Sequence, residues 1–427
     1  MAERNGSACM SVEGLSAREA AQMILRHIER EPALRVPLDD ALGSVLADDV
    51  ISPLDVPAFA NSAMDGYAVR SADVRGASAE HPVRLSVIEE IAAGSLPTRA
   101  VGPGECSRIF TGAPVPEGAD GVIRQEDTDQ GTPVVSVTSE RDAGSNVRPA
   151  GEDLRRGDLV LRAGTELGPA QLGALASVAR AHPLVYRRPR VAILATGDEV
   201  VDVDQTEEIL SGRKVASSNS HTLNALVRQA GGEPVMLGIA GDDPASIRRH
   251  IGTAFDCDLL VTTGGVSVGA HDHLRDVIAS LGAKLEFWRI RMRPGAPVGF
   301  GMLDEIPWIG LPGNPVSAMV AFDLLVRPAI RKLMGHDAVF RRAVTVRLME
   351  TVTVKPRLQH FLRAVVTEMG ETLEARLAGP QGSGILMSMV RANALLVLPE
   401  GQLETPKGAE ASALLFDEHR YDPAPPF

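Results

Sequence analysis

Cysteine and aromatic residues are scarce in this sequence of 427 residues. The three cysteines, Cys9, Cys106 and Cys257, are odd in number and lack the spacing of metal ligands or of a redox pair. We therefore expect structural thiols in a reducing compartment. Aromatic residues make up only 4% of the chain, which leaves little material for the stacking platforms that bind single-stranded nucleic acid.

Long apolar runs are also missing. The sequence has no run of about 18 apolar residues, and its first ten residues lack the apolar core of a signal peptide. This pattern predicts a cytoplasmic protein that does not cross a membrane. The net charge of -12 disfavours nonspecific binding to nucleic acid or to membrane surfaces, so an anionic ligand would need a local basic patch.

Three turn-rich segments stand out because each follows a short apolar run that reads as a buried strand. The runs are residues 191–194, 259–261 and 306–309, and the segments after them are residues 195–199, 262–269 and 310–317. In an open α/β sheet, the loops at the carboxyl ends of parallel strands converge on one crevice. We therefore expect all three segments to line a single site.

The N-terminal half predicts a β domain between two helical segments. Ser16 and Glu19 form the pattern of a capping box, and Pro169 suits the first turn of a second helix. Between them, residues 81–148 contain short apolar stretches broken by glycine and proline, without helical periodicity. This composition is typical of a small inserted β domain.

The C-terminal half predicts two further folding regions. Strands alternate with helices between residues 190 and 335, which is the pattern of a parallel-sheet α/β domain. After residue 341 the chain returns to strand alternation, with Val344 and Val346 opposite Thr345. Together with the length of the chain, these patterns predict several domains.

A basic stripe is predicted by Arg289, Arg291 and Arg293, which alternate with apolar residues. If this segment is a strand, its period of two places all three side chains on one face. Each guanidinium offers a flat donor fork that matches phosphate or another tetrahedral oxyanion. The alternative interpretation is a solvated strand face that pairs with surface carboxylates.

Two of the turn-rich segments have features of anion sites. Gly264 and Gly265, with Ser267 nearby, would let backbone N–H groups approach an anion closely. Asn314 could cap the helix that starts at Pro315, which would leave free N–H groups facing outward. An ordinary tight turn and ordinary helix initiation are the alternatives, although both segments fall in one domain.

Several carboxylates stand at turns, and a cluster of them would suit a hard cation. These residues are Asp65, Asp153, Glu199, Asp242 and Asp272. Turn aspartates commonly cap helices or stabilise Asx turns, which is the alternative interpretation for each of them. If they gather beside phosphate-binding loops, they would hold a divalent cation such as Mg²⁺.

Taken together in their order along the chain, the motifs resemble those of the molybdopterin molybdenumtransferase family, also called the MoeA/gephyrin family. The matching segments are residues 61–68, 111–116, 151–153, 196–199, 264–269, 311–317 and 381–383. Seven ordered motifs cover nearly the whole chain, which is far more specific than any single glycine loop.

The resemblance implies a multidomain α/β plus β fold, with a molybdopterin-binding α/β domain at its centre. The implied domains are a discontinuous helical linker domain (residues 1–56 and 150–186), an inserted β domain (57–149), the α/β domain (187–337) and a C-terminal β-barrel-like domain (338–427). It also implies a homodimer in which the α/β domain of one subunit is completed by β domains of the other.

The implied reaction is the insertion of molybdate into adenylylated molybdopterin, which releases AMP and molybdenum cofactor with the help of Mg²⁺ or a similar divalent ion. The adenylyltransferase and the molybdoenzymes are possible partners. The pterin carries the two thiolates that capture molybdenum, so a catalytic cysteine is unnecessary, in keeping with the low cysteine content.

The resemblance also implies roles for particular residues. The implied catalytic residues are Asp65, Thr111, Asp153, Glu199, Asp242 and Asp272, and Glu199, Asp242 and Asp272 would also hold the metal. The implied binding residues are Arg148, Gly264, Gly265, Ser267, Arg289, Arg293, Pro312, Gly313, Asn314, Pro315 and Ser383.

The chain departs from the family pattern at a few positions. Arg289 and Arg293 stand where lysines are common, and Ala296 stands where a lysine is frequent in Pro-Gly-Lys-Pro. A planar fork thus replaces a point charge, which bears on molybdate affinity. Two other functions stay open: a non-catalytic or specialised paralogue that carries cofactor or acts as a scaffold, and adenylylation of molybdopterin, the preceding step.

Overall fold

The computed structural model describes residues 14–254, 256–266, 273–355 and 357–416. The chain forms two compact units. The first contains residues 1–34, 43–47 and 184–427, and the second contains residues 35–42 and 48–183.

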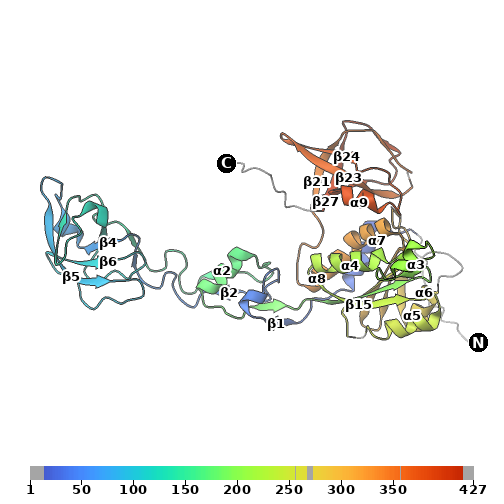
Figure 1. Ribbon diagram of the computed structural model, residues 1–427, viewed down its shortest axis with the longest axis horizontal. Coiled ribbons are helices and arrows are strands. Elements are labelled where there is room, and N and C mark those ends of the chain that lie inside the picture. Colours follow the sequence, from blue (N-terminus) through green and yellow to red (C-terminus); the bar gives the residue numbers. More distant parts are fainter. Residues whose placement is uncertain (1–13, 255, 267–272, 356, 417–427) are drawn as a thin grey trace, which may run out of the picture. The chain divides into compact units, whose positions relative to one another are not determined.

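A six-stranded sheet organises the first unit (Figure 1). In order across the sheet, its strands are β15 (Glu233–Ala240), β12 (Arg190–Thr196), β16 (Leu259–Thr263), β20 (Ile306–Leu311), β19 (Gly299–Leu303) and β17 (Lys284–Phe287). The first four strands are mutually parallel, whereas β19 is antiparallel to both of its neighbours. The predicted strands at residues 191–194, 259–261 and 306–309 are therefore confirmed, and each extends slightly beyond its predicted end.

Helices cover both faces of this sheet, because its strands are apolar on both sides. Within β12, Val191 and Ile193 enter one buried cluster, whereas Ala192 and Leu194 enter the other. The helices are α1 (Ala17–Arg26), α4 (Ser218–Gln229), α7 (Pro315–Ala321) and α8 (Arg327–Leu333) in the first cluster, and α5 (Pro244–Ile251) and α6 (Leu274–Ser280) in the second. A π-helical segment, Phe322–Val326, joins α7 to α8.

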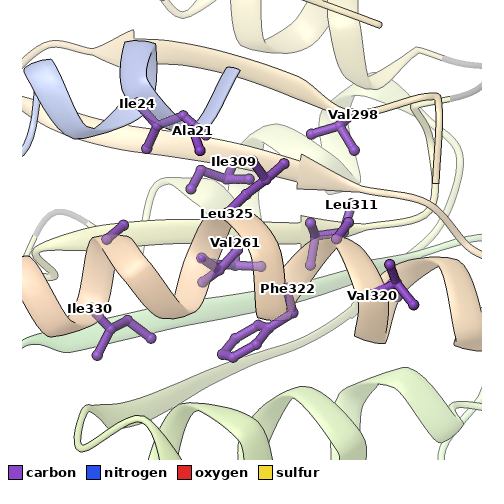
Figure 2. Close-up of a cluster of buried hydrophobic side chains, with 14 of the residues drawn as sticks. Ala21, Ile24, Val261, Val298, Ile309, Leu311, Val320, Phe322, Leu325 and Ile330 are labelled. Carbon is purple, nitrogen blue, oxygen red and sulfur yellow. The ribbon is translucent and has the colours of Figure 1, made fainter. Parts of the chain in front are cut away.

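Helix α1 packs into the core of the α/β domain. The capping box of Ser16 and Glu19 is confirmed, since each side chain bonds the backbone N–H of the other residue. Ala21 and Ile24 lie against the cluster that contains Ile309 and Leu325 (Figure 2). Burial of this face fixes a helix of only ten residues, which would be marginal on its own.

The C-terminal domain is a closed barrel. Its strands are β23 (Gln359–Met369), β24 (Thr372–Leu377), β21 (Ala343–Leu348), β27 (Glu410–Leu415) and β25 (Ala394–Leu398), and β25 pairs back with β23. The short strand β18 (Met292–Arg293) pairs in parallel with the start of β23. Val346 and Leu348 fill the interior, as the alternation in this segment predicts. The expected β-barrel-like domain is confirmed.

Shorter elements complete the first unit. They are β11 (Leu184–Tyr186), β13 (Val200–Val201), α3 (Thr206–Leu210), β14 (Val215–Ala216), β22 (Val352–Thr353), α9 (Leu386–Arg391) and β26 (Glu404–Thr405). Strand β1 (Ala33–Arg35), which pairs with β11, begins in this unit and ends at the first residue of the second.

The second unit contains the expected inserted β domain. Its sheet has the order β7 (Gly121–Arg124), β4 (Gly66–Val69), β6 (Glu105–Ile109), β5 (Val83–Ile91) and β8 (Val134–Val137). The same unit holds the ribbon of β2 (Val50–Ile51) and β10 (Leu159–Leu161), the pair β3 (Asn61–Ser62) and β9 (Val147–Arg148), and the helix α2 (Pro169–Ser177). Pro169 stands in the first turn of α2, as the sequence predicts.

The overall class is therefore the predicted one, a multidomain α/β plus β protein. The finer domain boundaries within each compact unit stay predictions. None of the described helices combines the length and the apolar character that a membrane crossing requires.

Replacing Ile24 with alanine should lower the free energy of unfolding of the α/β domain. The side chain is fully buried in α1, and removal of a buried isoleucine costs about 2–5 kcal/mol because a cavity remains. Chemical denaturation measures the change. Arg18→Ala, on the exposed side of the same helix, is the matched control and should change little. Equal effects of the two substitutions would contradict the packing of α1 into this core.

Candidate functional site

One cavity of about 610 Å³ collects the three turn-rich segments. Strands β12, β16 and β20 are adjacent and parallel, and Thr263 is paired with Ala195 on one side and with Leu311 on the other. Their carboxyl ends therefore lie at the same edge of the sheet. The residues that line the cavity are Ala195, Thr196, Gly197, Glu199, Val200, Val215, Ala216, Ser217, Ser218, Asn219, Asp242, Thr263, Gly264, Gly265, Val266, Pro297, Pro312, Gly313, Asn314 and Pro315. The expectation that the three loops meet is confirmed.

The glycine pair after β16 has a conformation and a packing that only glycine tolerates well. Gly264 and Gly265 have φ angles of 89° and 64°. A Cβ atom on Gly264 would lie 2.6 Å from the carbonyl oxygen of Thr196, and one on Gly265 would lie 3.0 Å from the Cβ of Leu274. The turn thus presses against the end of β12, and its backbone borders the cavity without intervening side chains.

In the loop between β20 and α7, the side chain of Asn314 does not cap the helix as the sequence suggests. Asn314 occupies the N-cap position and Pro315 the first helical position, but the Asn314 side chain makes no capping hydrogen bond. Asn314 is exposed at the cavity instead. Helix initiation by the Asn314 side chain therefore does not account for this residue, which leaves its amide available to a ligand. By contrast, Asp243 does cap α5, since its carboxylate accepts from the N–H of Ser246.

Two of the predicted metal-ligand carboxylates, Glu199 and Asp242, line the cavity. Asp242 is held by a reciprocal pair of bonds: Asp198 N–H donates to its Oδ2 over 3.2 Å, and Asp242 N–H donates to Asp198 Oδ1 over 3.0 Å. The third predicted ligand, Asp272, lies outside the described residues, as does Ser267. Among the residues that are described, no three His, Cys, Asp or Glu side chains gather in a metal-binding arrangement.

Sequence reasoning missed a hydrogen-bonded anchor beneath the loops. The side-chain amide of Asn219 donates to Thr263 Oγ1 over 2.8 Å and to the carbonyl oxygen of Gly313 over 2.9 Å. The Thr263 hydroxyl in turn donates to the carbonyl oxygen of Pro312 over 3.0 Å. No local sequence signal indicates this role, because the partners of Asn219 lie 44 and 94 residues further along the chain.

The interpretation of the arginine stripe as one strand is wrong. Only Met292 and Arg293 form a strand, because β17 ends at Phe287 and the chain then turns. The alternation of exposure persists, with Ile290 and Met292 buried. Apolar burial thus imposes the pattern without a continuous strand.

One arginine of the predicted stripe takes part in an ion pair, and the roles of the other two stay predictions. Arg291 bonds the carboxylate of Glu400 over 3.0 Å, as the alternative interpretation of a surface ion pair expects. Arg289 and Arg293 are exposed and are not among the described residues that line the cavity. The cavity therefore has carboxylates and backbone amides in its described wall, but no arginine or lysine side chain from that part of the chain.

The segment of Ser383 lies beside the start of α7. The N–H of Val316 donates to the carbonyl oxygen of Ser383 over 3.2 Å. Arg363, fully buried, shapes this segment by donating to the carbonyl oxygens of Pro380 and Gly382. Burial lowers the pKa of Arg363 to about 10, although an arginine with that pKa keeps its charge at neutral pH. Ser383 thus adjoins the cavity without lining it.

The remaining predicted site residues lie in the second unit. Asp65 accepts hydrogen bonds from both the N–H and the hydroxyl of Thr111, each over 2.8 Å. These two bonds, the backbone bond first, hold the pKa of the Asp65 carboxyl below its usual value. Arg148 is paired with Asn61 in the adjacent short ribbon, and Asp153 is exposed. Asp65 and Thr111 are brought together, and the roles of all four stay predictions.

The cysteines suit a structural role. Cys106 and Cys257 are free and buried, and burial raises the pKa of Cys106 to about 12, which disfavours a nucleophilic thiolate. Cys9 lies outside the described residues.

The fold and cavity define a class: an α/β protein with a cavity at the carboxyl ends of parallel strands, where such folds bind ligands, and with additional β domains. Family models match three consecutive regions. They are the MoeA N-terminal region (domains I and II) over residues 15–179, a probable molybdopterin-binding domain over residues 192–332, and the MoeA C-terminal region (domain IV) over residues 345–416.

Individual relatives agree with these matches. The chain is 37% identical over 412 residues to a molybdopterin molybdenumtransferase from Nostoc, with 93% of each chain covered. It is 36% identical to molybdopterin molybdenumtransferase 2 of Mycobacterium tuberculosis, over 92% of this chain and 98% of that one. A crystal structure of a molybdopterin biosynthesis MoeA protein from Pyrococcus horikoshii superimposes with a TM-score of 0.77 at 30% identity, covering 95% of this chain and all of that chain. The chain belongs to the MoeA family.

Gly265→Ala should destabilise the protein more than Gly282→Ala. Both glycines have positive φ, so both substitutions carry a backbone cost of about 1–2 kcal/mol. A methyl group at Gly282 meets open space, whereas one at Gly265 meets Leu274 and the Thr196 hydroxyl at 3.0 Å, which adds overpacking of about 1–3 kcal/mol. Chemical denaturation compares the two. Equal losses of unfolding free energy in the two variants would show that a methyl group at Gly265 fits without a steric clash.

Thr111→Val should raise the pKa of Asp65 towards its ordinary value. The substitution removes the hydroxyl donor, while the backbone N–H of residue 111 still donates, so part of the depression should persist. Carboxyl chemical shifts followed by NMR across pH 2–6 give the pKa directly. An Asp65 pKa that is unchanged in the variant would mean that the hydroxyl does not bond this carboxylate.

Proposed function

We propose that the protein inserts molybdenum from molybdate into the dithiolene of adenylylated molybdopterin and releases AMP. Family membership makes it an enzyme of molybdenum cofactor biosynthesis. The observation that carries the proposed reaction is the convergence of the three strand-end loops on one cavity, with the backbone of the glycine pair exposed to it.

The cavity walls suit a ligand with a flat ring and phosphates. Val200, Val215, Val266 and Pro297 offer apolar surface. The N–H of Gly264 donates to the carbonyl oxygen of Leu311 over 3.1 Å, so in this glycine pair the N–H of Gly265 is the one proposed to meet a phosphate. The volume of about 610 Å³ lies in the range of small-molecule sites. These features support a pterin nucleotide as the occupant.

The charge of the described wall favours a bound cation. Glu199 and Asp242 would repel the phosphates of the substrate and a molybdate dianion unless a positive charge lies between them. Mg²⁺ commonly takes one or two carboxylates together with substrate phosphate oxygens, so this pair fits Mg²⁺ or a similar ion. Such an ion would polarise the pyrophosphate bond and stabilise the charge that develops as AMP leaves.

The chain's own groups would then orient the substrate. The bonds between Asp198 and Asp242 hold one carboxylate in place, and the glycine turn fixes the phosphate-facing backbone. The dithiolene of the substrate supplies the sulfur ligands of molybdenum. Cleavage of the pyrophosphate would consume one water molecule, and the two oxygens that the thiolates displace from molybdate would leave as two water molecules, with protons from the dithiol and the solvent.

We further propose a cytoplasmic homodimer whose active site is shared between subunits. Asp65, Thr111, Arg148 and Asp153 are proposed to belong to that shared site, and Arg289, Arg293 and Ser383 to assist molybdate or phosphate binding. The family membership supports this arrangement, and the firm hold of Thr111 on the Asp65 carboxylate is compatible with a preorganised group. Contact with the adenylyltransferase would deliver the adenylylated pterin, and contact with molybdoenzymes would pass on the finished cofactor.

Glu199→Gln should lower turnover by about 10-fold to 1000-fold while the fold stays intact, because it removes a charge that holds the cation. The measurement is AMP release by the purified protein from adenylylated molybdopterin with molybdate and Mg²⁺ under anaerobic conditions. Glu207→Gln, an exposed position in α3, is the matched control and should keep wild-type turnover.

The same assay separates the alternative functions. AMP release that accompanies molybdenum incorporation supports the proposed reaction, whereas formation of adenylylated pterin from ATP would indicate adenylylation. A protein that does neither would be a carrier or scaffold. Full activity in Glu199→Gln would remove this carboxylate from the site.

A further inference from the structure

Asn219 lines the cavity and connects three elements that are distant in sequence. It lies in the first turn of α4, and its side-chain nitrogen contacts both the end of β16, at Thr263, and the loop after β20, at Gly313. No motif singled out from the sequence includes this residue.

The hydrogen bonds fix which way the Asn219 amide faces. Gly313 contributes a carbonyl oxygen, which can only accept. Thr263 donates its single hydroxyl proton to the carbonyl oxygen of Pro312, so its oxygen can only accept a hydrogen bond from Asn219. Both neighbours therefore demand the NH₂ group, and a flipped amide would place an oxygen against two acceptors.

One polar atom of this side chain is left over. Both protons of Nδ2 are used, whereas Oδ1 accepts no hydrogen bond from the part of the chain that the structure describes. An amide oxygen at a cavity wall is a pure acceptor, so its complement is an N–H donor.

We propose that Asn219 is a positioning and specificity residue of the cavity, which locks the strand-end loops and accepts a hydrogen bond from a ring N–H or amino group of the substrate. This inference rests on the proposed function for the identity of that substrate. Adenylylated molybdopterin carries such donors on both its pterin and its adenine, and the shared chemistry is a nitrogen donor at the edge of a flat heterocycle.

The anchoring role has a matched pair of test positions on one strand. Thr263 faces the cavity and bonds Asn219, whereas Thr262 faces the opposite side of the sheet and accepts from the indole N–H of Trp308 over 3.1 Å. Threonine-to-valine substitution at either position removes one buried hydroxyl of the same size. Only the substitution at Thr263 removes the hydrogen bonds that join the end of β16 to Asn219 and to the loop after β20.

The experiment measures binding of adenylylated molybdopterin to the full chain by titration calorimetry, with molybdate omitted so that turnover stops. Asn219→Ala and Thr263→Val should each raise the Kd by about tenfold, the change that loss of one ordinary hydrogen bond produces. Thr262→Val should leave the Kd unchanged, although it should lower the Tm. Unchanged binding by Asn219→Ala, with its Tm within a few degrees of wild type, would overturn the proposal.

A second arm identifies the donor. AMP and purine riboside 5′-monophosphate differ only by the exocyclic amine. If the wild type binds AMP more tightly and Asn219→Ala abolishes the difference, the donor is the adenine amine. If both bind the wild type equally while Asn219→Ala still weakens binding of adenylylated molybdopterin, the donor is on the pterin.

The two proposals can fail separately. If the wild type binds adenylylated molybdopterin with the predicted dependence on Asn219 but releases no AMP on addition of molybdate, the role of Asn219 stands and the proposed reaction fails. If AMP release proceeds and the Asn219→Ala variant keeps the wild-type KM, the reaction stands and the role of Asn219 fails.

Discussion

The parallel register of β12, β16 and β20 is the constraint on which the site depends. Because Ala195, Thr263 and Leu311 are aligned across three adjacent strands, the loops that follow them must emerge side by side. Two apolar clusters, one on each face of the sheet, hold this register in place. A slip of one residue in β16 would exchange its two faces, turning Thr263 away from Asn219 and Thr262 towards it.

The chemistry of the cavity follows from backbone geometry more than from basic side chains. Consecutive positive φ angles at Gly264 and Gly265 keep side chains out of this part of the wall, with the N–H of Gly264 bonded to the carbonyl oxygen of Leu311, whereas Glu199 and Asp242 add negative charge. An anionic substrate is compatible with such a wall when a cation accompanies it. The net charge of -12 suggested a compensating basic patch, and the arginines expected to supply it, Arg289 and Arg293, are not part of the described wall.

Much of the fold could be predicted because its signals are local. The capping box at Ser16, the proline that begins α2 and the apolar runs of the parallel strands each report on a few neighbouring residues. The prediction of one arginine-bearing strand is wrong because alternating burial also arises in a chain that turns against a core. Burial of Ile290 and Met292 enforces the pattern there without strand pairing at residues 288, 289 and 291.

The site was predictable at its loops and not at its supports. Glycine and proline mark tight turns wherever they occur, so the segments after β12, β16 and β20 could be identified directly. Asn219 depends on two partners, 44 and 94 residues further along the chain, and nothing in its immediate sequence announces them. The same holds for Arg363, whose bonds to the segment before Ser383 reach carbonyl oxygens 17 and 19 residues further along the chain.

Hydrogen–deuterium exchange of the full chain, with and without adenylylated molybdopterin, tests most directly whether the strand-end loops form the binding site. The account predicts slower exchange in peptides that cover residues 195–199, 263–266 and 311–317, with β24 of the barrel unchanged. Protection confined to other segments, while those three loops exchange at the ligand-free rate, would contradict it.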